Sequence, residues 1–302
     1  MRYHGEEASR LVELKILTRQ VDRLLEFSDH PLIMGVVNVT PDSFFDGGRF
    51  FDAAAAVAHA LRLVEEGADL LDIGAESTRP GADVVNEAEE CRRAIPVVTA
   101  VAKAVTIPVS IDTSKAAVAR AAIDAGASLV NDVTALRGDS AMADLIVKTG
   151  AGIVLMHMQG TPRTMQQAPR YDDVVVEISE FFEERISFAT AHGIARRQII
   201  LDPGIGFGKL LRHNLTVLAR LNQFLQFDCP LMVGVSQKSF LGELVSRSVQ
   251  ERQWATAAAV AMAVDRGAGI IRVHDVRAMK DVVQVAAAVS RQTSEVMKAR
   301  HA

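Results

Sequence analysis

Short apolar segments, rich in β-branched and aliphatic residues, recur along the chain from residue 32 onward. Longer stretches rich in Ala, Leu and Glu separate them, and their apolar residues recur with helical spacing. Continuous apolar strands that alternate with amphipathic helices are typical of a parallel sheet covered by helices. We therefore expect strands at 32–37, 69–73, 107–111, 128–133, 152–156, 198–202, 230–235 and 269–273. The expected helices include 52–66, 86–104, 115–125, 172–192 and 251–266.

Three of the expected helix-to-strand joints share a short sequence pattern in which glycine is followed by alanine. The glycines are Gly67, Gly126 and Gly267. A glycine can end a helix in the left-handed conformation, after which a small residue enters the next strand. Eight such strand and helix units, joined by right-handed crossovers, predict an α/β protein with a closed (β/α)8 TIM barrel. A doubly wound open sheet would give the same periodicity and is kept as the alternative.

No composition break or low-complexity linker divides the chain. We expect one barrel domain over residues 31–302, preceded by a charged N-terminal extension, residues 1–30, to which we assign no role. The extension lacks the apolar core of a secretory signal, and apolar runs such as Ala257–Val264 are far shorter than the roughly 20 residues that cross a bilayer. The sequence therefore predicts a cytoplasmic protein that does not use a membrane.

The formal net charge is −4. This value argues weakly against nucleic acid and anionic membranes as partners, because both usually attract a basic surface. The 2 cysteines, Cys91 and Cys229, belong to no CxxC or Cys/His ligand pattern. The composition therefore indicates neither a disulfide framework nor a structural zinc site.

Polar side chains stand at or just after the end of nearly every expected strand. They are Asn38, Asp72, Glu76, Asp112, Asn131, Asp132, His157, Asp202, Ser236, Lys238, Arg272 and His274. In a parallel barrel all these strand ends lie on one face, where the loops build the site. Acidic and Ser residues there can simply cap the next helix. Capping does not explain a Lys, an Arg and two His, so we interpret the set as a site.

The charges of these groups indicate two kinds of ligand chemistry. One set suits an anion such as a diphosphate: Arg79, Lys238, Arg272, His274 and Asn38. The other set offers acceptors and an amide to the donor-rich edge of a heterocycle: Asp112, Asn131 and Asp202. A substrate with an amino-heterocycle at one end and a phosphate ester at the other would use both sets.

The glycine-rich segment 204–209 (GIGFGK) follows an expected strand but matches neither GxGxxG nor GxxxxGK[ST]. We interpret it as a tight turn that needs positive φ angles and projects Phe207 into the mouth of the site. His157, between two methionines, is interpreted as packing or pocket wall rather than a metal ligand. Two loops rich in Gly, Pro and Asp, 38–49 and 75–82, are candidate lids. The alternative, a plain connecting turn, fits the second loop better than the first.

Eight segments, taken in order from about residue 31 to residue 285, resemble the motifs of the dihydropteroate synthase family. They are NVTPDSFFDGG (38–48), DIGAESTRPGA (72–82), SIDTSK (110–115), NDV (131–133), MHMQGTP (156–162), DPGIGFGK (202–209), SQKSF (236–240) and RVHDV (272–276). The resemblance implies a TIM-barrel enzyme of folate biosynthesis that joins 6-hydroxymethyl-7,8-dihydropterin diphosphate to 4-aminobenzoate and releases diphosphate. It also implies Mg²⁺ as cofactor, a homodimer and competition by sulfonamides.

The resemblance implies roles for individual positions. The pterin-binding positions are Asp112, Asn131, Asp202, Lys238 and Arg272, and all of these except Asn131 are also implied in catalysis. The diphosphate contacts are Asn38, Arg79, Arg272 and His274, with Asn38 as the implied Mg²⁺ ligand. The 4-aminobenzoate pocket takes Phe44, Thr78, Arg79, Pro80, Phe207 and Ser236. The implied chemistry is departure of diphosphate, followed by capture of the pterin methylene cation by the aniline nitrogen.

The chain departs from the usual family motifs at Gln237, where Arg is common, at Phe45, where many members have Ser, and at Ala75, where many have Gly. The missing guanidinium removes a charge and a stacking surface beside Lys238. A catalytically weak or silent pterin-binding paralogue therefore stands as one alternative. A methyltetrahydrofolate–corrinoid methyltransferase is another, but that relative lacks the first-loop motif, the ESTRP motif and the Arg-x-His pair found here.

Overall fold

The structure is a computed structural model that describes residues 12–17, 22–27, 30–39, 53–77 and 84–301, with side chains in the ranges 30–39, 53–77 and 84–292. Eight of its strands form one sheet in which each bonded pair of neighbours is parallel. They are β3 (Leu32–Asn38), β4 (Leu70–Gly74), β5 (Val109–Asp112), β6 (Leu129–Asp132), β7 (Gly152–Met156), β8 (Ile199–Asp202), β9 (Met232–Val233) and β10 (Ile270–Val273). All eight strands predicted from the apolar pattern are thus confirmed.

The sheet closes on itself. Its order is β8-β7-β6-β5-β4-β3-β10-β9, and a parallel bridge between Leu201 and Leu231 joins the two outer strands. The amide of Leu201 also donates to the carbonyl of Pro230 at 2.9 Å. The closed (β/α)8 barrel is therefore confirmed, and the open-sheet alternative is wrong.

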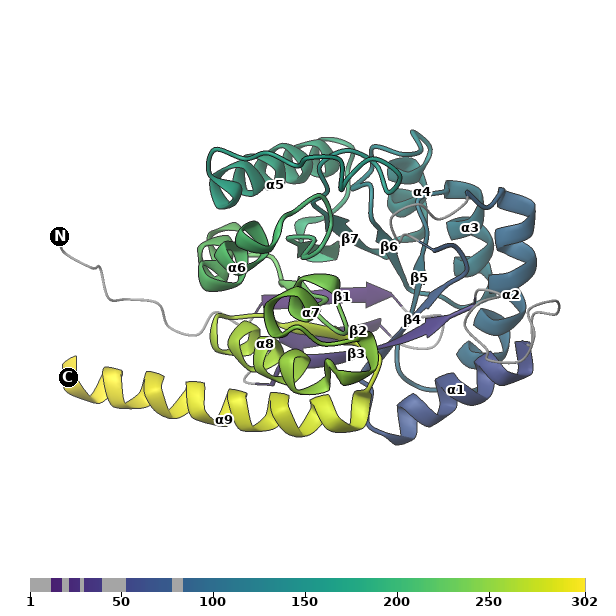
Figure 1. Ribbon diagram of the computed structural model, residues 1–302. Helices are drawn as coiled ribbons and strands as arrows, with labels where there is room; N and C mark the ends of the chain where they lie inside the picture. The colour runs from purple at the N-terminus through teal and green to yellow at the C-terminus, as the bar shows by residue number, and fades with distance from the viewer. Residues whose placement is uncertain (1–11, 18–21, 28–29, 40–52, 78–83, 302) are drawn as a thin grey trace.

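Helices surround the strands on the outside of the barrel (Figure 1). They are α1 (Ala53–Glu65), α2 (Glu87–Ala104), α3 (Ala116–Ala125), α4 (Met142–Thr149), α5 (Val174–Ala191), α6 (Leu211–Ala219), α7 (Ser239–Val245), α8 (Gln253–Asp265) and α9 (Val276–His301). Short 3-10 turns occur at η2 (Arg196–Gln198), η3 (Leu221–Phe227) and η4 (Val249–Glu251). The predicted helices correspond to α1, α2, α3, α5 and α8.

The N-terminal extension contains an antiparallel hairpin of β1 (Val12–Leu17) and β2 (Asp22–Phe27). Strand β1 contacts β7 and the turn η2, which directly precedes β8. Because η2 leads into a barrel strand, the hairpin packs at the end of the barrel where the strands begin. The hairpin is therefore packed against the end opposite the polar strand ends, a contact that the sequence did not reveal.

Side chains of the barrel strands alternate between the interior and the helices. One interior layer is apolar and consists of Met34, Leu70, Leu129, Val154, Ile200, Met232 and Ile270. Intervening residues such as Ile33, Leu71 and Ile153 belong to the larger core that includes the helices. Two residues beyond the apolar layer, the same inward face carries a polar layer that includes Asp72, Asn131, Asp202 and Arg272. The alternation of side chains along each strand thus places the polar layer directly above the apolar layer inside the barrel.

The three glycines predicted at helix-to-strand joints all have positive φ angles. The values are +99° at Gly67, +121° at Gly126 and +90° at Gly267. Only glycine adopts such angles without strain. At Gly126 a Cβ atom would also lie 2.7 Å from the Cβ of Ala102, so this joint requires glycine for packing as well.

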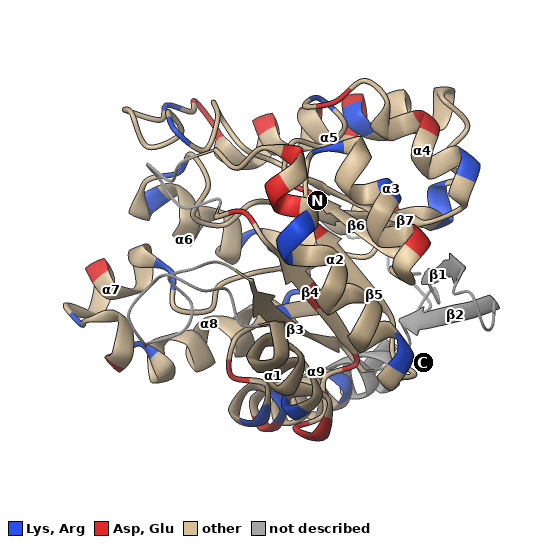
Figure 2. Ribbon diagram, turned by 90° about the vertical axis from the view of Figure 1, so that its right-hand side faces the viewer, with Lys and Arg blue, Asp and Glu red and all other residues tan. Residues whose placement is uncertain are grey.

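Charged residues of both signs are interspersed over the helices on the side shown in Figure 2. Within the described residues, we find no helix with the length and apolar character needed to cross a membrane. Cys91 and Cys229 are both free thiols. The cytoplasmic location stays a prediction.

Candidate active site

A network of charged and amide side chains forms the floor of the barrel mouth. Asp72 lies at its centre, where its Oδ2 accepts hydrogen bonds from Asn131 Nδ2 at 2.9 Å and from Arg272 Nε at 2.7 Å. Arg272 Nη2 donates to Asp112 Oδ2 at 3.2 Å. The network therefore joins β4, β5, β6 and β10 and brings together three of the predicted pterin-binding residues, Asp112, Asn131 and Arg272.

The floor is rich in acceptors that one guanidinium only partly compensates. Burial and the nearby Asp72 carboxylate raise the pKa of Asp112 to about 7, against the opposite effect of Arg272. Burial also raises the pKa of Asp202, against the lowering effect of Lys238. Within the described part of the chain, Asp72 Oδ1 is buried without a hydrogen-bond partner. A ligand edge with several N–H donors would satisfy such a floor.

Lys238 and Phe207 lie together beside the floor. The ammonium Nζ of Lys238 is 4.4 Å from the centre of the Phe207 ring and donates to the carbonyl of Ile205. Burial lowers the pKa of Lys238 to about 8, although Asp202 acts in the opposite direction. Phe207 packs against a small apolar cluster of Val133, Met156, Met158 and Met165. The site thus combines a cation, an aromatic ring and an apolar wall.

The segment 204–209 is a tight turn, as predicted. Its glycines have φ angles of +65° at Gly204, +83° at Gly206 and +59° at Gly208. A Cβ on Gly204 would overlap the carbonyl oxygen of His157. Asp202 Oδ1 accepts the amide of Gly204 at 2.7 Å, so this predicted pterin-binding residue also anchors the turn that carries Phe207.

Lys209, which the sequence analysis did not assign to the site, holds this turn from inside. Its Nζ lies 2.9 Å from His157 Nδ1 and 3.0 Å from the carbonyl oxygens of Gly204 and Phe207. Burial lowers its pKa to about 7. The only signal in the sequence is its place at the end of the glycine motif, and that place alone does not reveal a buried amine.

His157 is 6% exposed, and its ring meets that of Phe181 edge-on at 4.9 Å. Burial, together with Lys209, lowers its pKa well below the usual value. These contacts support its interpretation as a packing residue. Over the described residues, no group of three or more His, Cys, Asp or Glu is arranged to hold a metal ion.

Ser236 and His274 meet at the ends of two neighbouring segments. His274 Nδ1 lies 3.0 Å from Ser236 Oγ, and the His274 amide also donates to that oxygen at 3.3 Å. Asn38 ends β3, the strand between β4 and β10, and pairs in register with Gly74. These three residues therefore lie on the same face of the barrel as the floor.

Two acids at strand ends serve the structure instead of the floor. Asp132 accepts hydrogen bonds from the Thr134 amide, the Thr134 hydroxyl and the Leu136 amide at 2.6–2.8 Å. It caps the chain after β6 because the alternation that turns Asn131 inward turns its neighbour outward. Glu76 pairs with Lys115 at 2.5 Å. The interpretation of the whole set as ligand-binding is therefore wrong for these two residues.

Four of the implied site residues, Phe44, Thr78, Arg79 and Pro80, lie outside the described residues, as does Phe45. Their predicted roles remain predictions, as do the candidate lids at 38–49 and 75–82. Asp72 appears among the strand-end residues of the sequence analysis, but the resemblance assigned it no binding role. Asp72 follows the apolar Leu70 by two residues and so lies on the same inward face of β4. This spacing is the signal that could have placed it in the floor.

Comparison with known proteins agrees with this geometry. Residues 34–274 match the family described as "Pterin binding enzyme". A dihydropteroate synthase of Escherichia coli strain K12 is 46% identical over 256 residues, which cover 85% of this chain and 90% of that protein. A crystal structure of Yersinia pestis dihydropteroate synthase with a sulfonamide drug superposes with a TM-score of 0.86 at 43% identity, covering 91% of this chain and 99% of that one.

A second solved structure is dihydropteroate synthase from Xanthomonas albilineans in complex with 7,8-dihydropteroate. It has a TM-score of 0.80 at 44% identity and covers 88% of this chain and 96% of that one. The family match spans most of the chain, and the identities are well above the level at which only the fold is shared. The chain therefore belongs to the pterin binding enzymes and, within them, to the dihydropteroate synthase family.

Proposed function

We propose that this chain is a dihydropteroate synthase, which joins 6-hydroxymethyl-7,8-dihydropterin diphosphate to 4-aminobenzoate and releases diphosphate. The observation that carries the proposal is the acceptor-rich floor, in which Asp72 and Asp112 share the guanidinium of Arg272. The edge of a heterocycle that carries ring N–H and amino groups would donate hydrogen bonds to these carboxylates. The family membership of the chain supports the same activity.

The pterin ring would lie on the floor with its N–H groups directed at the carboxylates. Asp112 and Asp202 would accept from the ring, and Asn131 would orient it through its amide. Lys238 would donate to a ring acceptor from beside Phe207, where its ammonium lies. Arg272 is bound to floor carboxylates in this structure, which supports its predicted place at the pterin. Its predicted contact with diphosphate stays a prediction.

In the reaction, the bond between the pterin methylene carbon and the diphosphate oxygen breaks, and the diphosphate leaves with the electron pair. The aniline nitrogen of 4-aminobenzoate then bonds to the methylene carbon and loses a proton. The chain's contribution is to hold the two substrates in line and to keep water from the cation. Phe207 and its apolar neighbours supply a water-poor wall on one side.

A magnesium ion fits the donors of the site as a partner of the diphosphate. Asn38 offers an amide oxygen, half-buried at the end of β3, and Mg²⁺ is commonly held by one or two protein oxygens together with substrate phosphates. When bound, the ion would neutralise charge on the departing diphosphate. Asn38 is therefore the residue that we propose as its protein ligand.

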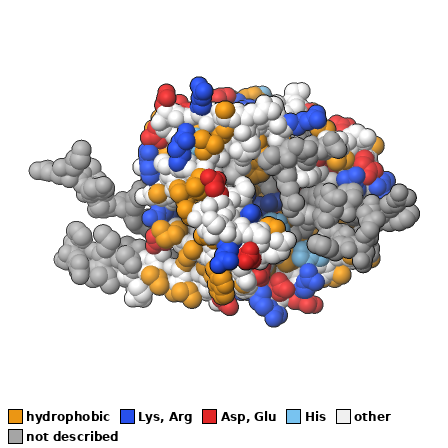
Figure 3. Space-filling view, viewed as in Figure 1, with side chains coloured by type: hydrophobic (Ala, Val, Ile, Leu, Met, Phe, Trp, Pro, Cys, Tyr) orange, Lys and Arg blue, Asp and Glu red, His pale blue; other side chains and the backbone are white. Residues whose placement is uncertain are grey.

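We also propose that the protein is a homodimer. Apolar side chains gather on the surface over α8 and α9 (Figure 3). Trp254 is 81% exposed, and Val285 and Val289 are 66% and 60% exposed. A second copy of the chain would remove these side chains from water, which favours association.

A steady-state assay with both substrates, with and without Mg²⁺ and with and without a sulfonamide, tests the proposed activity. Formation of dihydropteroate that requires Mg²⁺ and is inhibited by the drug would support it. A folded protein that binds pterin but forms no product would instead support the silent paralogue. Methyl transfer from methyltetrahydrofolate to a corrinoid protein would support the methyltransferase.

A further inference from the structure

The side chain of Lys238 contacts three consecutive residues of the turn 204–209. Its Nζ donates to the carbonyl of Ile205 and lies 4.4 Å from the centre of the Phe207 ring. Between these two residues, a Cβ atom added to Gly206 would lie only 2.8 Å from Cδ of Lys238, so the aliphatic stem crosses the turn at this glycine. The shape of the turn therefore decides where the ammonium lies beside the floor.

Lys209 bridges the two carbonyls that flank this contact. Its Nζ lies 3.0 Å from the carbonyl oxygen of Gly204 and 3.0 Å from that of Phe207, and residues 205–206 lie between them. An amine carries at least two N–H donors in either protonation state, which is enough for both carbonyls. Lys209 therefore fixes the span of chain that Lys238 contacts.

Water cannot replace Lys209 as the donor inside the turn. The residue is 3% exposed, and its Nζ also lies 2.9 Å from Nδ1 of the buried His157. Gln166 provides a contrast, because its Nε2 donates to the carbonyl of Gly206 at 2.9 Å from an exposed position. Water can take the place of an exposed donor, whereas a buried carbonyl without its donor carries the full cost of desolvation. The same turn thus has one buried donor and one exposed donor that can be compared.

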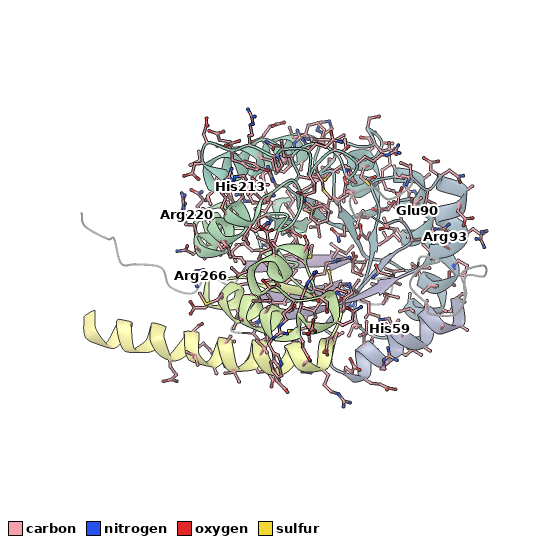
Figure 4. The ribbon with its side chains drawn as sticks, viewed as in Figure 1. His59, Glu90, Arg93, His213, Arg220 and Arg266 are labelled. Atoms are coloured by element: carbon pink, nitrogen blue, oxygen red, sulfur yellow. The ribbon has the colours of Figure 1, made fainter. Side chains whose placement is uncertain are left out.

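Other contacts hold the turn to the barrel when the buried amine is removed. The Gly206 amide donates to Oδ1 of Asn214, on α6, at 2.7 Å. The hydroxyl of Tyr171 donates to the Gly208 carbonyl at 2.7 Å, and its ring meets that of His213 edge-on at 4.9 Å. His213 is labelled on α6 in Figure 4. Loss of the amine should therefore shift the turn without unfolding it.

We propose that Lys209 is a positioning residue for pterin binding, which holds the turn 204–209 in the shape that places the ammonium of Lys238 at the floor. The proposal rests on the proposed synthase function, which names the pterin as the ligand. Lys209 also acts on the floor through its charge: burial raises the pKa of Asp202, and Lys209 is one of the groups that lower it. The experiment therefore has to separate the N–H donors of Lys209 from its charge.

Two variants of similar size make this separation. Lys209→Gln keeps N–H donors without the charge, whereas Lys209→Met has neither. We expect the Kd of 6-hydroxymethylpterin, measured by calorimetry, to rise about tenfold in Lys209→Met and about threefold in Lys209→Gln, because only methionine leaves both carbonyls without a donor. An equal rise in the two variants would overturn the proposal, since it would assign the effect to charge or packing. An unchanged Kd in Lys209→Met would overturn it as well.

A double-mutant cycle with Lys238→Met tests whether the effect passes through Lys238. The effects of two residues that act through one contact are not additive. In the Lys238→Met background, we therefore expect Lys209→Met to change the Kd by less than about twofold. A loss that persists undiminished in this background would show that Lys209 acts on another part of the floor, such as Asp202, and would overturn the proposal. Urea denaturation establishes that each variant is folded under the conditions of the binding measurement.

Gln166→Met is the matched control, because it removes a donor from the same turn at an exposed position. Its Kd for 6-hydroxymethylpterin should stay within about twofold of the wild-type value. A loss equal to that in Lys209→Met would overturn the proposal, since every contact with the turn would then have the same effect. A wild type that binds this pterin but forms no dihydropteroate would refute the proposed function instead, and the cycle would still decide the role of Lys209.

Discussion

The carboxylate of Asp72 accepts a hydrogen bond from the guanidinium of Arg272 at 2.7 Å, although 200 residues separate them in the sequence. The two residues lie on β4 and β10, the strands on either side of β3. Asp72 is 0% exposed, so water does not compensate its charge. The contact therefore makes the floor of the site depend on the pairing of the second and last barrel strands, β4 and β10, with the first strand, β3.

Arg272→Met should destabilise the folded protein strongly. The change leaves the buried Asp72 and the neighbouring Asp112 without their cationic partner, and removal of one member of a buried pair costs about 3–5 kcal/mol. We expect a loss of this size in the free energy of unfolding, measured by urea denaturation at neutral pH. Arg62→Met is the control, since that side chain is 62% exposed and its pair with Glu66 is 3.9 Å long. Equal stability of the two variants would contradict the role given to Arg272.

The pH dependence of stability should report on Asp112. Its pKa rises from 3.8 to about 7 in the folded state, so between these values the folded chain binds the proton more tightly than the unfolded chain. The stabilisation is complete below pH 3.8 and is lost as the pH rises through about 7. Urea denaturation from pH 5 to pH 8 should show the wild type losing stability relative to Asp112→Asn, by at most about 1.4 kcal/mol per pH unit. Parallel curves for the two proteins would show that Asp112 is already ionised at pH 5.

Lys209→Met should loosen the turn that carries Phe207. Methionine fills a similar volume but leaves the carbonyl oxygens of Gly204 and Phe207 without their donor and removes the polar contact with His157 Nδ1, at a cost of about 1–3 kcal/mol. The folded-state pKa of Lys209 is lowered from 10.5 to about 7, so its contribution is present above pH 10.5 and is lost as the pH falls through about 7. Denaturation at pH 7 and pH 9 should therefore show a larger deficit of the variant at pH 9. The exposed Lys148→Met serves as control, and an equal deficit at both pH values would refute a neutral buried amine.

The sequence predicted the strands because period and composition are local properties. The strand-end pattern named Asn131 and Asp132 together, and only ligand chemistry and the family resemblance selected Asn131. Two adjacent polar residues at a strand end do not show which of them points inward until one face of the strand is known to be the interior. Leu129 lies in the interior layer of the closed barrel, so Asn131, two residues later, also points inward and Asp132 points outward. The same rule would have placed Asp72, which follows Leu70 by two residues.

Other features depend on contacts that no local pattern records. The cluster of Lys115, Glu76 and Glu90 joins residues 25 and 39 positions apart, and each residue alone is typical of a solvated helix or loop. Lys209 likewise lies in the turn before α6, where a lysine is normally exposed, and only packing buries it. The N-terminal hairpin was missed because the strand prediction rested on continuous apolar runs, whereas residues 12–16 alternate apolar and charged side chains, as a strand with one exposed face does.

Substitution of the exposed tryptophan should weaken association of two copies. Trp254→Ser removes the most exposed large apolar side chain of the described surface, and such aromatic residues often dominate interface energies. Light scattering across a range of concentrations should show a dimer for the wild type and a shift toward monomer for the variant. Leu225→Ser, at a side chain that is 44% exposed on η3, controls for a general effect of apolar-to-polar change. A wild type that is monomeric throughout would contradict the proposed homodimer.

Gln237→Arg should strengthen pterin binding. The backbone of Gln237 has a φ angle of +58° and is held by Thr256, whose hydroxyl accepts its amide at 3.2 Å, and by Arg252, which donates to its carbonyl at 3.0 Å. These bonds involve only the backbone of residue 237, so the substitution leaves them intact. A guanidinium beside Lys238 adds a charge and a planar surface for stacking, which at an exposed position lowers the Kd of 6-hydroxymethylpterin about two- to fivefold. Calorimetry on Gln237→Arg and on the uncharged control Gln237→Met separates this effect from bulk alone. An equal Kd for the two variants would show that glutamine at this position costs the enzyme nothing in pterin affinity.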